Sequence, residues 1–393
     1  MKTPDTTRRV SILPIRRISF LFLLIVLLSA CSGSGPQTTL EPEGPIANDI
    51  NNLWLLVFWV ATAVFVVVEV ALVYAIWKFR ERRNDDRRPR QSHGNTALEI
   101  TWTIIPAVLL AVVTVPMISG LFDMRREPIG DVLHIKVTGH QWWWEFEYVD
   151  EVASDGRTII TANELHIPAN RDVYLTMTSA DVIHSFWVPK LNGKRDVVPG
   201  RITNLTLHAD APTPLDHPHL GQCAEFCGLA HADMRIRAFV HDAAGYNEWV
   251  AGQLEPNLAT GPGWDTFRAF CTLCHQVTID DGGAIVTFGP SIPDRGLTLT
   301  VDGVDFKSSR APNLTHFGSR STFAGATFAN TVEHLSSFID DPSSLKPMDP
   351  DRNELRTVDE IKDGQRDRIL GMPDYGLDQA EIDAVVRLLR SWN

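Results

Sequence analysis

The chain has 393 residues, more than one ordinary domain holds. Its formal net charge of −12 argues against nucleic-acid binding, because proteins of that class carry a basic surface. An acidic exterior instead suits a basic protein partner, through electrostatic steering. The five cysteines are an odd number, and each lies in a recognisable chemical setting. None is therefore left for a structural disulfide.

Residues 1–30 have the pattern of a secretory signal peptide. Arginines precede an apolar run from Ile18 to Leu28, which is too short to span a bilayer. The run ends in Leu28-Ser-Ala-Cys31, which resembles a bacterial lipoprotein cleavage site and would make Cys31 the lipidated N-terminus. The alternative is ordinary cleavage nearby with an incidental cysteine. We expect residues 31–50 to form a tether rich in Gly, Pro and Thr.

Two apolar stretches, Leu53–Trp77 and Ile100–Leu121, are each long enough for a transmembrane helix. The loop at 78–98 between them carries seven basic residues from Lys78 to Arg90, which places it in the cytoplasm. Residues 51–122 therefore predict a helical hairpin in a bacterial cytoplasmic membrane, crossed more than once, with both long ends outside.

Two acidic residues belong to this hairpin. Glu69 lies inside the first apolar stretch, and a carboxylate at that depth is a functional candidate by default. The alternative is a protonated or partnered acid that faces a neighbouring subunit. Glu99 lies at the cytoplasmic end of the second stretch, where a helix N-terminus stabilises negative charge.

Short strands are expected over residues 123–245. Val132–Thr138 and Val173–Thr178 alternate or run apolar, with many β-branched residues, and Pro, Gly, Asn and Asp mark the turns. Gly139–Tyr148 contains three consecutive tryptophans, Trp142 to Trp144, which are costly to expose. The structural interpretation is a strand that packs one face on a core.

Two segments of this region carry side chains that bind transition metals. Gly221–Met234 holds two thiols, an imidazole and a thioether, and Val182–Pro189 adds a second imidazole. Thiolate and thioether are soft ligands, and imidazole suits copper. The five candidate ligands are His184, Cys223, Cys227, His231 and Met234.

Residue types alone leave three interpretations of these side chains. Two thiolates could bridge two coppers, each with one terminal imidazole, whereas a mononuclear blue-copper site uses a single cysteine. A tetrahedral zinc site of two Cys and two His would leave Met234 without a role. A disulfide between Cys223 and Cys227 would persist outside the cytoplasm, provided that their Cα atoms lie within about 7 Å.

The pattern Cys-x-Glu-x-Cys-x-x-x-His-x-x-Met, preceded by His-Ser-Phe-Trp-Val-Pro, resembles the binuclear copper (CuA) site of the cytochrome c oxidase subunit II family. The resemblance extends from about Asn51 to about His241 and implies an all-β cupredoxin-like Greek-key domain at 123–245. It implies that Cys223 and Cys227 bridge two coppers. The further implied ligands are the imidazoles of His184 and His231, the weak thioether of Met234 and the backbone carbonyl of Glu225.

The same resemblance implies roles beyond the copper ligands. The Glu225 side chain would face a magnesium site shared with subunit I. Trp142 would relay electrons from an incoming cytochrome. Glu99, three residues before Trp102, would lie at the mouth of a proton path into subunit I. With the ligand set complete, we expect the nearby imidazoles to be loop residues; these are His208, His217 and His219.

A haem-attachment sequence follows a predicted linker at 246–262. In Cys271-Thr-Leu-Cys274-His275, the cysteines would form thioether bonds to the porphyrin, and His275 would bind the iron. Thioredoxin-like chemistry is the alternative, but it fits poorly because no βαβ pattern surrounds the motif. Residues 263–393 resemble an all-α class I c-type cytochrome.

The second axial ligand of such a haem should be a methionine. Met372 precedes a helix predicted by the capping box Asp378-Gln-Ala-Glu381 and by an apolar stripe at helical spacing. Met348 is the rival. Pro312 is expected to orient His275 through its carbonyl, with Pro290 as the alternative.

Together these features resemble subunit II of a bacterial haem–copper oxidase with a cytochrome c domain fused at its C-terminus. The resemblance implies that electrons from a cytochrome c or similar donor pass through the chain's own haem c to CuA. Subunit I, assembled with subunit III, would then reduce oxygen to water and pump protons. The alternatives are the entry subunit of a CuA-dependent nitric oxide reductase and a copper-handling membrane lipoprotein. A quinol oxidase subunit would lack the copper ligands.

Overall fold

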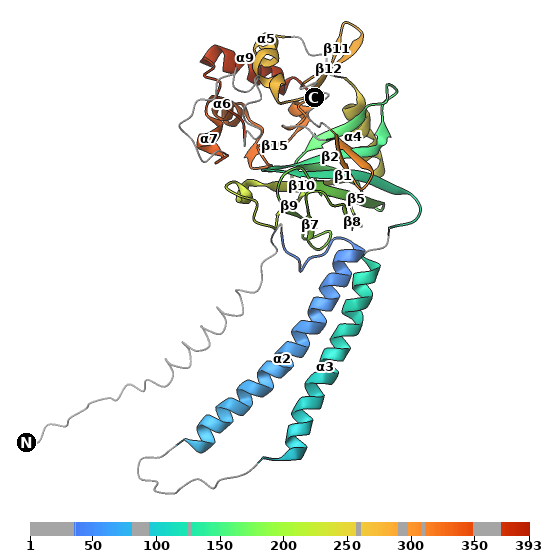
Figure 1. The fold of residues 1–393 in the computed structure, drawn as a ribbon, viewed down its shortest axis with the longest axis vertical. Helices are drawn as coiled ribbons and strands as arrows, with labels where there is room; N and C mark the ends of the chain where they lie inside the picture. The colour runs from blue at the N-terminus through green and yellow to red at the C-terminus, as the bar shows by residue number, and fades with distance from the viewer. Residues whose placement is uncertain are drawn as a thin grey trace, which may run out of the picture.

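The computed structural model describes most of the chain, namely residues 35, 37–80, 94–124, 127–256, 261–289, 298–307, 311–348 and 371–393. Several predicted features lie outside these residues: the signal peptide at 1–30 with the lipidation site at Cys31, most of the cytoplasmic loop at 78–98, and the alternative Pro290. Residues 349–370 also lie outside them. In Figure 1, a β sandwich separates two long helices on one side from the C-terminal region on the other.

The two predicted membrane helices are confirmed as helices. They are α2 (Pro45–Phe79) and α3 (Thr96–Asp123), and both are long and apolar enough to cross a membrane. Asn95 caps α3, because its side chain accepts hydrogen bonds from the backbone of Ala97 and Leu98. Their apolar side chains pack on little else in the chain, as expected for surfaces that face lipid or another subunit.

The predicted tether at 31–50 is shorter than expected, because α2 already begins at Pro45. The residues just before it are bound to the sandwich. The amide of Glu43 donates to the carbonyl of Lys190 over 2.9 Å, and the amide of Asp210 donates to the carbonyl of Glu43 over 3.0 Å. The first membrane helix is thus anchored directly beneath the β domain.

The β domain consists of two five-stranded sheets packed face to face, as the resemblance implied. The first has the order β3-β2-β1-β5-β8, formed by β1 (Val132–His140), β2 (Trp143–Val152), β3 (Thr158–Ala162), β5 (Asp172–Ser179) and β8 (Thr203–Leu207). The second has the order β4-β10-β9-β6-β7, formed by β4 (Glu164–Pro168), β6 (His184–Trp187), β7 (Arg195–Val197), β9 (His219–Cys223) and β10 (Arg235–His241). The pairs β1–β5 and β4–β10 are parallel, and the other pairs within these sheets are antiparallel.

The core of the sandwich explains the aromatic run. Trp144, Phe146 and Tyr148 alternate along β2, and their side chains are fully buried. Leu133, Ile135 and Val137 do the same on β1, so the period-2 pattern of the sequence places one apolar face of each strand against the other sheet.

A helix stands where a linker was predicted to begin. α4 (Ala243–Leu254) starts at Asp242, whose carboxylate accepts from the amide of Gly245, and it occupies the first part of the expected linker at 246–262. Its Trp249 stacks on His166 of β4, with ring centroids 4.5 Å apart. The chain therefore leaves the sandwich along a packed helix.

The C-terminal region contains β hairpins as well as helices, so the all-α expectation is wrong for the residues described. Its helices are α5 (Trp264–Phe270), α6 (Val332–Asp340), α7 (Pro342–Leu345) and α9 (Gln379–Arg390), with short 3₁₀ turns at Cys271–Leu273 and Phe317–Ser319. The hairpins pair β11 (Val277–Asp281) with β12 (Ala284–Phe288), β13 (Thr298–Val301) with β14 (Val304–Lys307), and β15 (Thr322–Phe323) with β16 (Phe328–Ala329). The first two hairpins occupy much of residues 277–307, for which the sequence analysis gave no structure.

Helices α5 and α9 of this region pack closely against each other. Phe267 meets Trp392 edge-to-face, with ring centroids 4.9 Å apart. Gly263 allows the approach, because a β-carbon there would lie 2.5 Å from the carbonyl carbon of Ala384. The predicted capping box of α9 is confirmed, and its apolar stripe is buried.

Candidate metal centre and haem-attachment segment

The five predicted metal ligands come together at the ends of two inner strands of the second sheet. His184 begins β6 and Cys223 ends β9, two paired strands, and the turn after Cys223 carries the remaining ligands. The Cys223 amide donates to the carbonyl of Met234 over 2.8 Å, which closes this turn. We call the side chains of His184, Cys223, Cys227, His231 and Met234, together with the Glu225 carbonyl, the ligand cluster.

Neighbouring donor atoms of the ligand cluster lie close enough together to bind the same metal ion. The Cys223 Sγ lies 3.9 Å from the Cys227 Sγ, 3.9 Å from the His184 Nδ1 and 3.2 Å from the Glu225 carbonyl oxygen. The Cys227 Sγ lies 3.5 Å from the His231 Nδ1 and 3.9 Å from the Met234 Sδ. Both thiols and Met234 are buried.

This geometry separates the three interpretations left open by the sequence. The two sulfurs are not bonded to each other, and their separation far exceeds the ~2.05 Å of a disulfide. The thioether of Met234 takes part in the cluster, and a zinc site would have no use for it. Two bridging sulfurs, two imidazoles, a thioether and a carbonyl fit a pair of copper ions.

Asp181 orients one imidazole of the cluster, and the sequence analysis did not single it out. Its carboxylate accepts from the His184 Nε2 over 2.8 Å, which leaves Nδ1 directed at the sulfurs. Burial opposes the charged imidazole, but the bonds to Asp181 and Cys223 outweigh it and raise the pKa of His184. A carboxylate three residues before a candidate histidine ligand was the available signal.

The two thiols share their protons unequally. The hydrogen bond between the sulfurs lowers the pKa of Cys223, and the same bond, together with burial, raises the pKa of Cys227. The pair therefore gives up one proton readily and the second reluctantly. Metal binding must displace that second proton, because thiolates are the ligands.

Trp142 touches the ligand cluster directly. Its indole N–H donates to the carbonyl of Cys227 over 2.9 Å, and the side-chain amide of Gln141 donates to the same carbonyl over 2.7 Å. The Trp142 side chain is only 3% exposed. Both its packing and its predicted role in electron transfer therefore belong to a buried side chain.

The predicted haem-attachment segment lies at the end of α5. Cys271 to Leu273 form a 3₁₀ turn, and His275 Nδ1 donates to the carbonyl of Pro312 over 2.7 Å, which confirms the expected orienting contact. Burial lowers the pKa of His275 to about 4, against the effect of the Pro312 bond. The imidazole is therefore neutral at pH 7, with Nε2 available to bind iron.

The segment around Met372 lies close to these cysteines. The ring of Tyr375 packs on Phe270, with centroids 5.4 Å apart, and burial with the nearby Cys274 and Cys271 thiols raises the pKa of Tyr375. Met348 is also near this segment, because a β-carbon on Gly371 would lie 2.3 Å from the Met348 Cβ. Met372 is partly buried against the core, whereas Met348 is buried.

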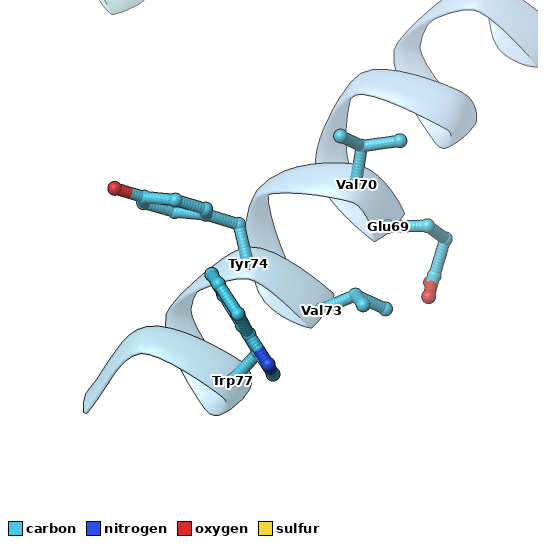
Figure 2. Close-up of a pocket in the computed structure, with 5 residues that line it drawn as sticks. All are labelled: Glu69, Val70, Val73, Tyr74 and Trp77. Atoms are coloured by element: carbon cyan, nitrogen blue, oxygen red, sulfur yellow. The ribbon is translucent and has the colours of Figure 1, made fainter. Parts of the chain in front are cut away.

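The remaining candidate residues are dispersed. Figure 2 shows Glu69 on α2 beside Val73, on an exposed surface that also carries Tyr74 and Trp77. Glu99 lies in the first turn of α3. His208 and His217 pair with Asp172 and Asp216, as loop residues commonly do. The prediction that His219 is a loop residue is wrong, because His219 is buried within β9.

Two family models match this chain, one over the β domain and one over the two long helices. The model described as "Cytochrome C oxidase subunit II, periplasmic domain" matches residues 133–240, and the one described as the transmembrane domain matches residues 40–119. Cytochrome c oxidase subunit 2 of Alkalihalophilus pseudofirmus is 36% identical over 350 residues, covering 85% of this chain and 92% of the relative. The chain belongs to the cytochrome c oxidase subunit II family.

Other relatives carry the same name. Cytochrome c oxidase subunit 2 of Bacillus subtilis is 31% identical over 350 residues, covering 84% of this chain and 90% of the relative. A solved structure of the periplasmic domain of subunit II from Bradyrhizobium japonicum has 31% identity and a TM-score of 0.29, covering 32% of this chain and 95% of that structure.

Family membership establishes the general role of this subunit. It is part of a haem–copper oxidase, an oxidoreductase complex of electron transport, and it acts together with subunit I. Its periplasmic domain implies a CuA copper centre, and the donor set of the ligand cluster fits that centre. The two apolar helices and the periplasmic domain make it a membrane protein with a domain outside.

Proposed function

We propose that this chain is the electron-entry subunit of a bacterial haem–copper oxidase and that it carries its own haem c. Electrons from a cytochrome c or similar donor enter at the segment of Cys271, Cys274 and His275. They then pass through the ligand cluster to subunit I, where oxygen is reduced to water with proton pumping. The proposed order of domains is the predicted one: signal peptide, tether, membrane hairpin, CuA domain, linker and haem domain. The tether and the linker are shorter than predicted, and the C-terminal region contains β hairpins.

The convergence of the ligand cluster is the observation that carries this proposal. Cys223 and Cys227 would hold the copper through their thiolates, and each imidazole lies beside one sulfur, His184 beside Cys223 and His231 beside Cys227. Met234 and the Glu225 carbonyl complete the set. Copper held by two bridging thiolates supplies a one-electron centre whose geometry changes little with its redox state. The paired strands and the turn after β9 bury the two thiols, the thioether and the His184 imidazole.

The haem assignment rests on the Cys-x-x-Cys-His spacing together with the Pro312 contact. Cys271 and Cys274 would attach the porphyrin and His275 would bind the iron, in the neutral tautomer that the Pro312 carbonyl selects. We assign the other axial position to Met372, because its segment contacts the residue that precedes Cys271.

Several finer assignments belong to the same proposal. The exposed Glu225 carboxylate binds magnesium at the subunit I interface, Trp142 relays electrons into the cluster, Glu99 marks a proton-path entry, and Cys31 is lipidated. Subunit III belongs to the complex. Large apolar side chains exposed beside the ligand cluster support a covering subunit there; they are Ile183, Phe226 and Leu229.

Neither alternative function is favoured by an observation. The relatives compared above carry the name cytochrome c oxidase subunit 2, which supports the oxidase over a nitric oxide reductase subunit. A copper-delivery lipoprotein needs a labile site, whereas His184 and Cys223 lie buried on paired strands and Cys227 is buried in the turn that follows.

The test is an anaerobic redox titration of the full chain, purified with subunit I after expression with haem maturation, and followed by EPR and visible spectra. We expect the mixed-valence copper signal of two equivalent ions and a low-spin c-type haem band. A mononuclear copper signal would contradict the binuclear assignment, and absence of the haem band would contradict the haem route. Met234→Leu should alter the copper spectrum, whereas Met177→Leu, at a buried position of β5, should not.

A further inference from the structure

The C-terminal region and the β sandwich are joined by a buried polar interface next to the ligand cluster. The segment at 320–327, which contains β15 and the turn after it, lies with the end of α7 against the surface that carries Trp142 and Asp233. Its contacts are hydrogen bonds between well-placed groups, which depend on geometry more strongly than apolar contact does.

Lys346 is the centre of this interface. Its side chain is only 3% exposed, and its ammonium donates to three backbone carbonyls: Trp142 over 2.9 Å, Asp233 over 3.1 Å and Ala324 over 3.0 Å. Two of these carbonyls belong to the sandwich and one to the C-terminal region. An ammonium has three donors, so every N–H of this side chain is satisfied.

The two sandwich carbonyls lie beside functional residues. Trp142 bonds to the Cys227 carbonyl through its indole, and Asp233 directly precedes Met234. One lysine of the C-terminal region therefore touches the backbone on both sides of the ligand cluster.

Glu164 makes a second, reciprocal bond between the two parts. It is 2% exposed on β4, and its carboxylate accepts from the amide and hydroxyl of Ser321 over 3.2 and 2.6 Å. It also accepts from the amide and hydroxyl of Thr322 over 2.8 and 2.6 Å. The sandwich thus supplies a buried acid and the C-terminal region a buried base.

Gly325 shows how close the two parts are. A β-carbon there would lie 2.1 Å from the Asp233 carbonyl oxygen, 2.6 Å from the Lys346 Nζ and 3.0 Å from the Trp142 carbonyl oxygen, and its φ is +77°. The Gly325 carbonyl accepts from the amide of Arg235, over 2.9 Å. Only glycine fits such an approach.

Burial of Lys346 is expensive, which argues that the residue has a task. Desolvation lowers the pKa of Lys346 to about 7, with Asp233 and Cys227 acting in the opposite direction. Buried charges persist where their partners are fully arranged, and removing one partner is strongly destabilising.

We propose that Lys346, with Glu164 as a second anchor, is a positioning residue that fixes the haem-attachment region on the Trp142 side of the ligand cluster. The electron-transfer part of this inference rests on the proposed function. The partner of the surface over Trp142 is then the chain's own C-terminal region. An external donor must deliver electrons to that region, because the surface over Trp142 is already occupied.

The first test measures the interface without reference to either metal centre. Hydrogen exchange of the purified complex is compared between the native chain, Lys346→Met and Lys194→Met, a matched control at an exposed lysine over Trp187. In Lys346→Met, the amides of Arg235, Ser321 and Thr322 should exchange at least about tenfold faster, whereas the control should match the native chain. Unchanged exchange in Lys346→Met would overturn the proposal.

The second test measures electron transfer from the haem to copper after a light pulse. We expect Lys346→Met to keep both spectra but to slow this step by at least about tenfold, because small displacements of a reacting group are costly. Native transfer rates in a variant with both centres loaded would contradict a positioning role. Loss of the haem band in the native chain would instead contradict the proposed function, and the exchange experiment would still decide on the anchor.

A second variant covers the case in which Lys346→Met does not fold. Glu164→Gln keeps the size of the side chain but removes its charge, and Glu333→Gln on the exposed face of α6 is its control. Faster exchange at Ser321 and Thr322 in Glu164→Gln alone supports the second anchor. Equal exchange in both variants would oppose it.

Discussion

At the scale of the residue, the ligand cluster depends on a glycine that is not itself a metal ligand. Gly139 lies on β1 behind the imidazole of His184, and a β-carbon there would lie 2.8 Å from the His184 Cδ2 and 3.3 Å from the ring of Trp144. Both side chains are fully buried, so neither can turn out to solvent, and the imidazole, which is in the closer contact, must be displaced.

We therefore predict that Gly139→Ala displaces His184 and weakens copper binding by about 10- to 100-fold, as changes behind a metal ligand usually do. Copper content after dialysis against a graded chelator measures this loss. Gly252→Ala is the control, because its β-carbon would point into open space on α4. Equal copper retention in the two variants would show that His184 tolerates the added methyl group.

A second prediction at this scale distinguishes Met372 from Met348. Replacing the iron ligand by alanine should abolish the sulfur-to-iron absorption band of the oxidised haem and lower its reduction potential, because a thioether ligand raises that potential. We expect this result for Met372→Ala and a native spectrum for Met348→Ala. The reverse outcome would move the axial ligand to Met348.

At the scale of the element, α4 is bound to the sandwich by a stack of neutral rings. His166 lies between Trp249 and Phe239, with ring centroids 4.5 and 4.7 Å away, and its Nδ1 pairs with the His241 Nε2 over 2.9 Å. Burial, with His241 and Arg320 nearby, holds the pKa of His166 well below its usual 6.5. The folded stack therefore favours the neutral imidazole over the protonated one.

This stack predicts a loss of stability in acid. Below about pH 6.5 the unfolded chain takes up a proton that the folded His166 refuses, so the free energy of unfolding falls by about 1.4 kcal/mol per pH unit for this residue. His166→Phe keeps the ring and removes the proton uptake. Its unfolding temperature, measured by calorimetry, should fall less steeply between about pH 6.5 and 5.5. His217→Phe, at an exposed histidine, should behave like the native chain.

The elements that could be predicted from the sequence are those whose signal is local. The strand at Val132, the capping box at Asp378 and the spacing of Cys223 to Met234 each need only a few consecutive residues. Lys346 escaped prediction because its role arises from contacts between distant segments. Asp181 lies only three residues before His184, so its local signal was present but was not used. The hairpins of the C-terminal region join strands that are adjacent in the sequence, and they were missed because the expected all-α domain left no place for them.

At the scale of the whole molecule, the helices α2 and α3 leave the sandwich on the side opposite the C-terminal region (Figure 1). We predict that alkaline phosphatase fused after Asp131 is active, because it is exported, and that the same enzyme fused after Gly94 is inactive. The charge of the segment from Lys78 to Arg90 is the physical reason. Activity of the Gly94 fusion would reverse the orientation of the hairpin.

On the electron route proposed above, the anchors at Lys346 and Glu164 also predict the kinetic order of electron delivery. Both side chains are buried, so dissolved ions screen their bonds very little. Transfer within this chain is then unimolecular and independent of ionic strength. Capture of a basic donor by a chain of net charge −12 is bimolecular and slows as salt is added. A plot of turnover against ionic strength thus reports on the donor alone, and the plateau at low salt gives the speed of the internal step.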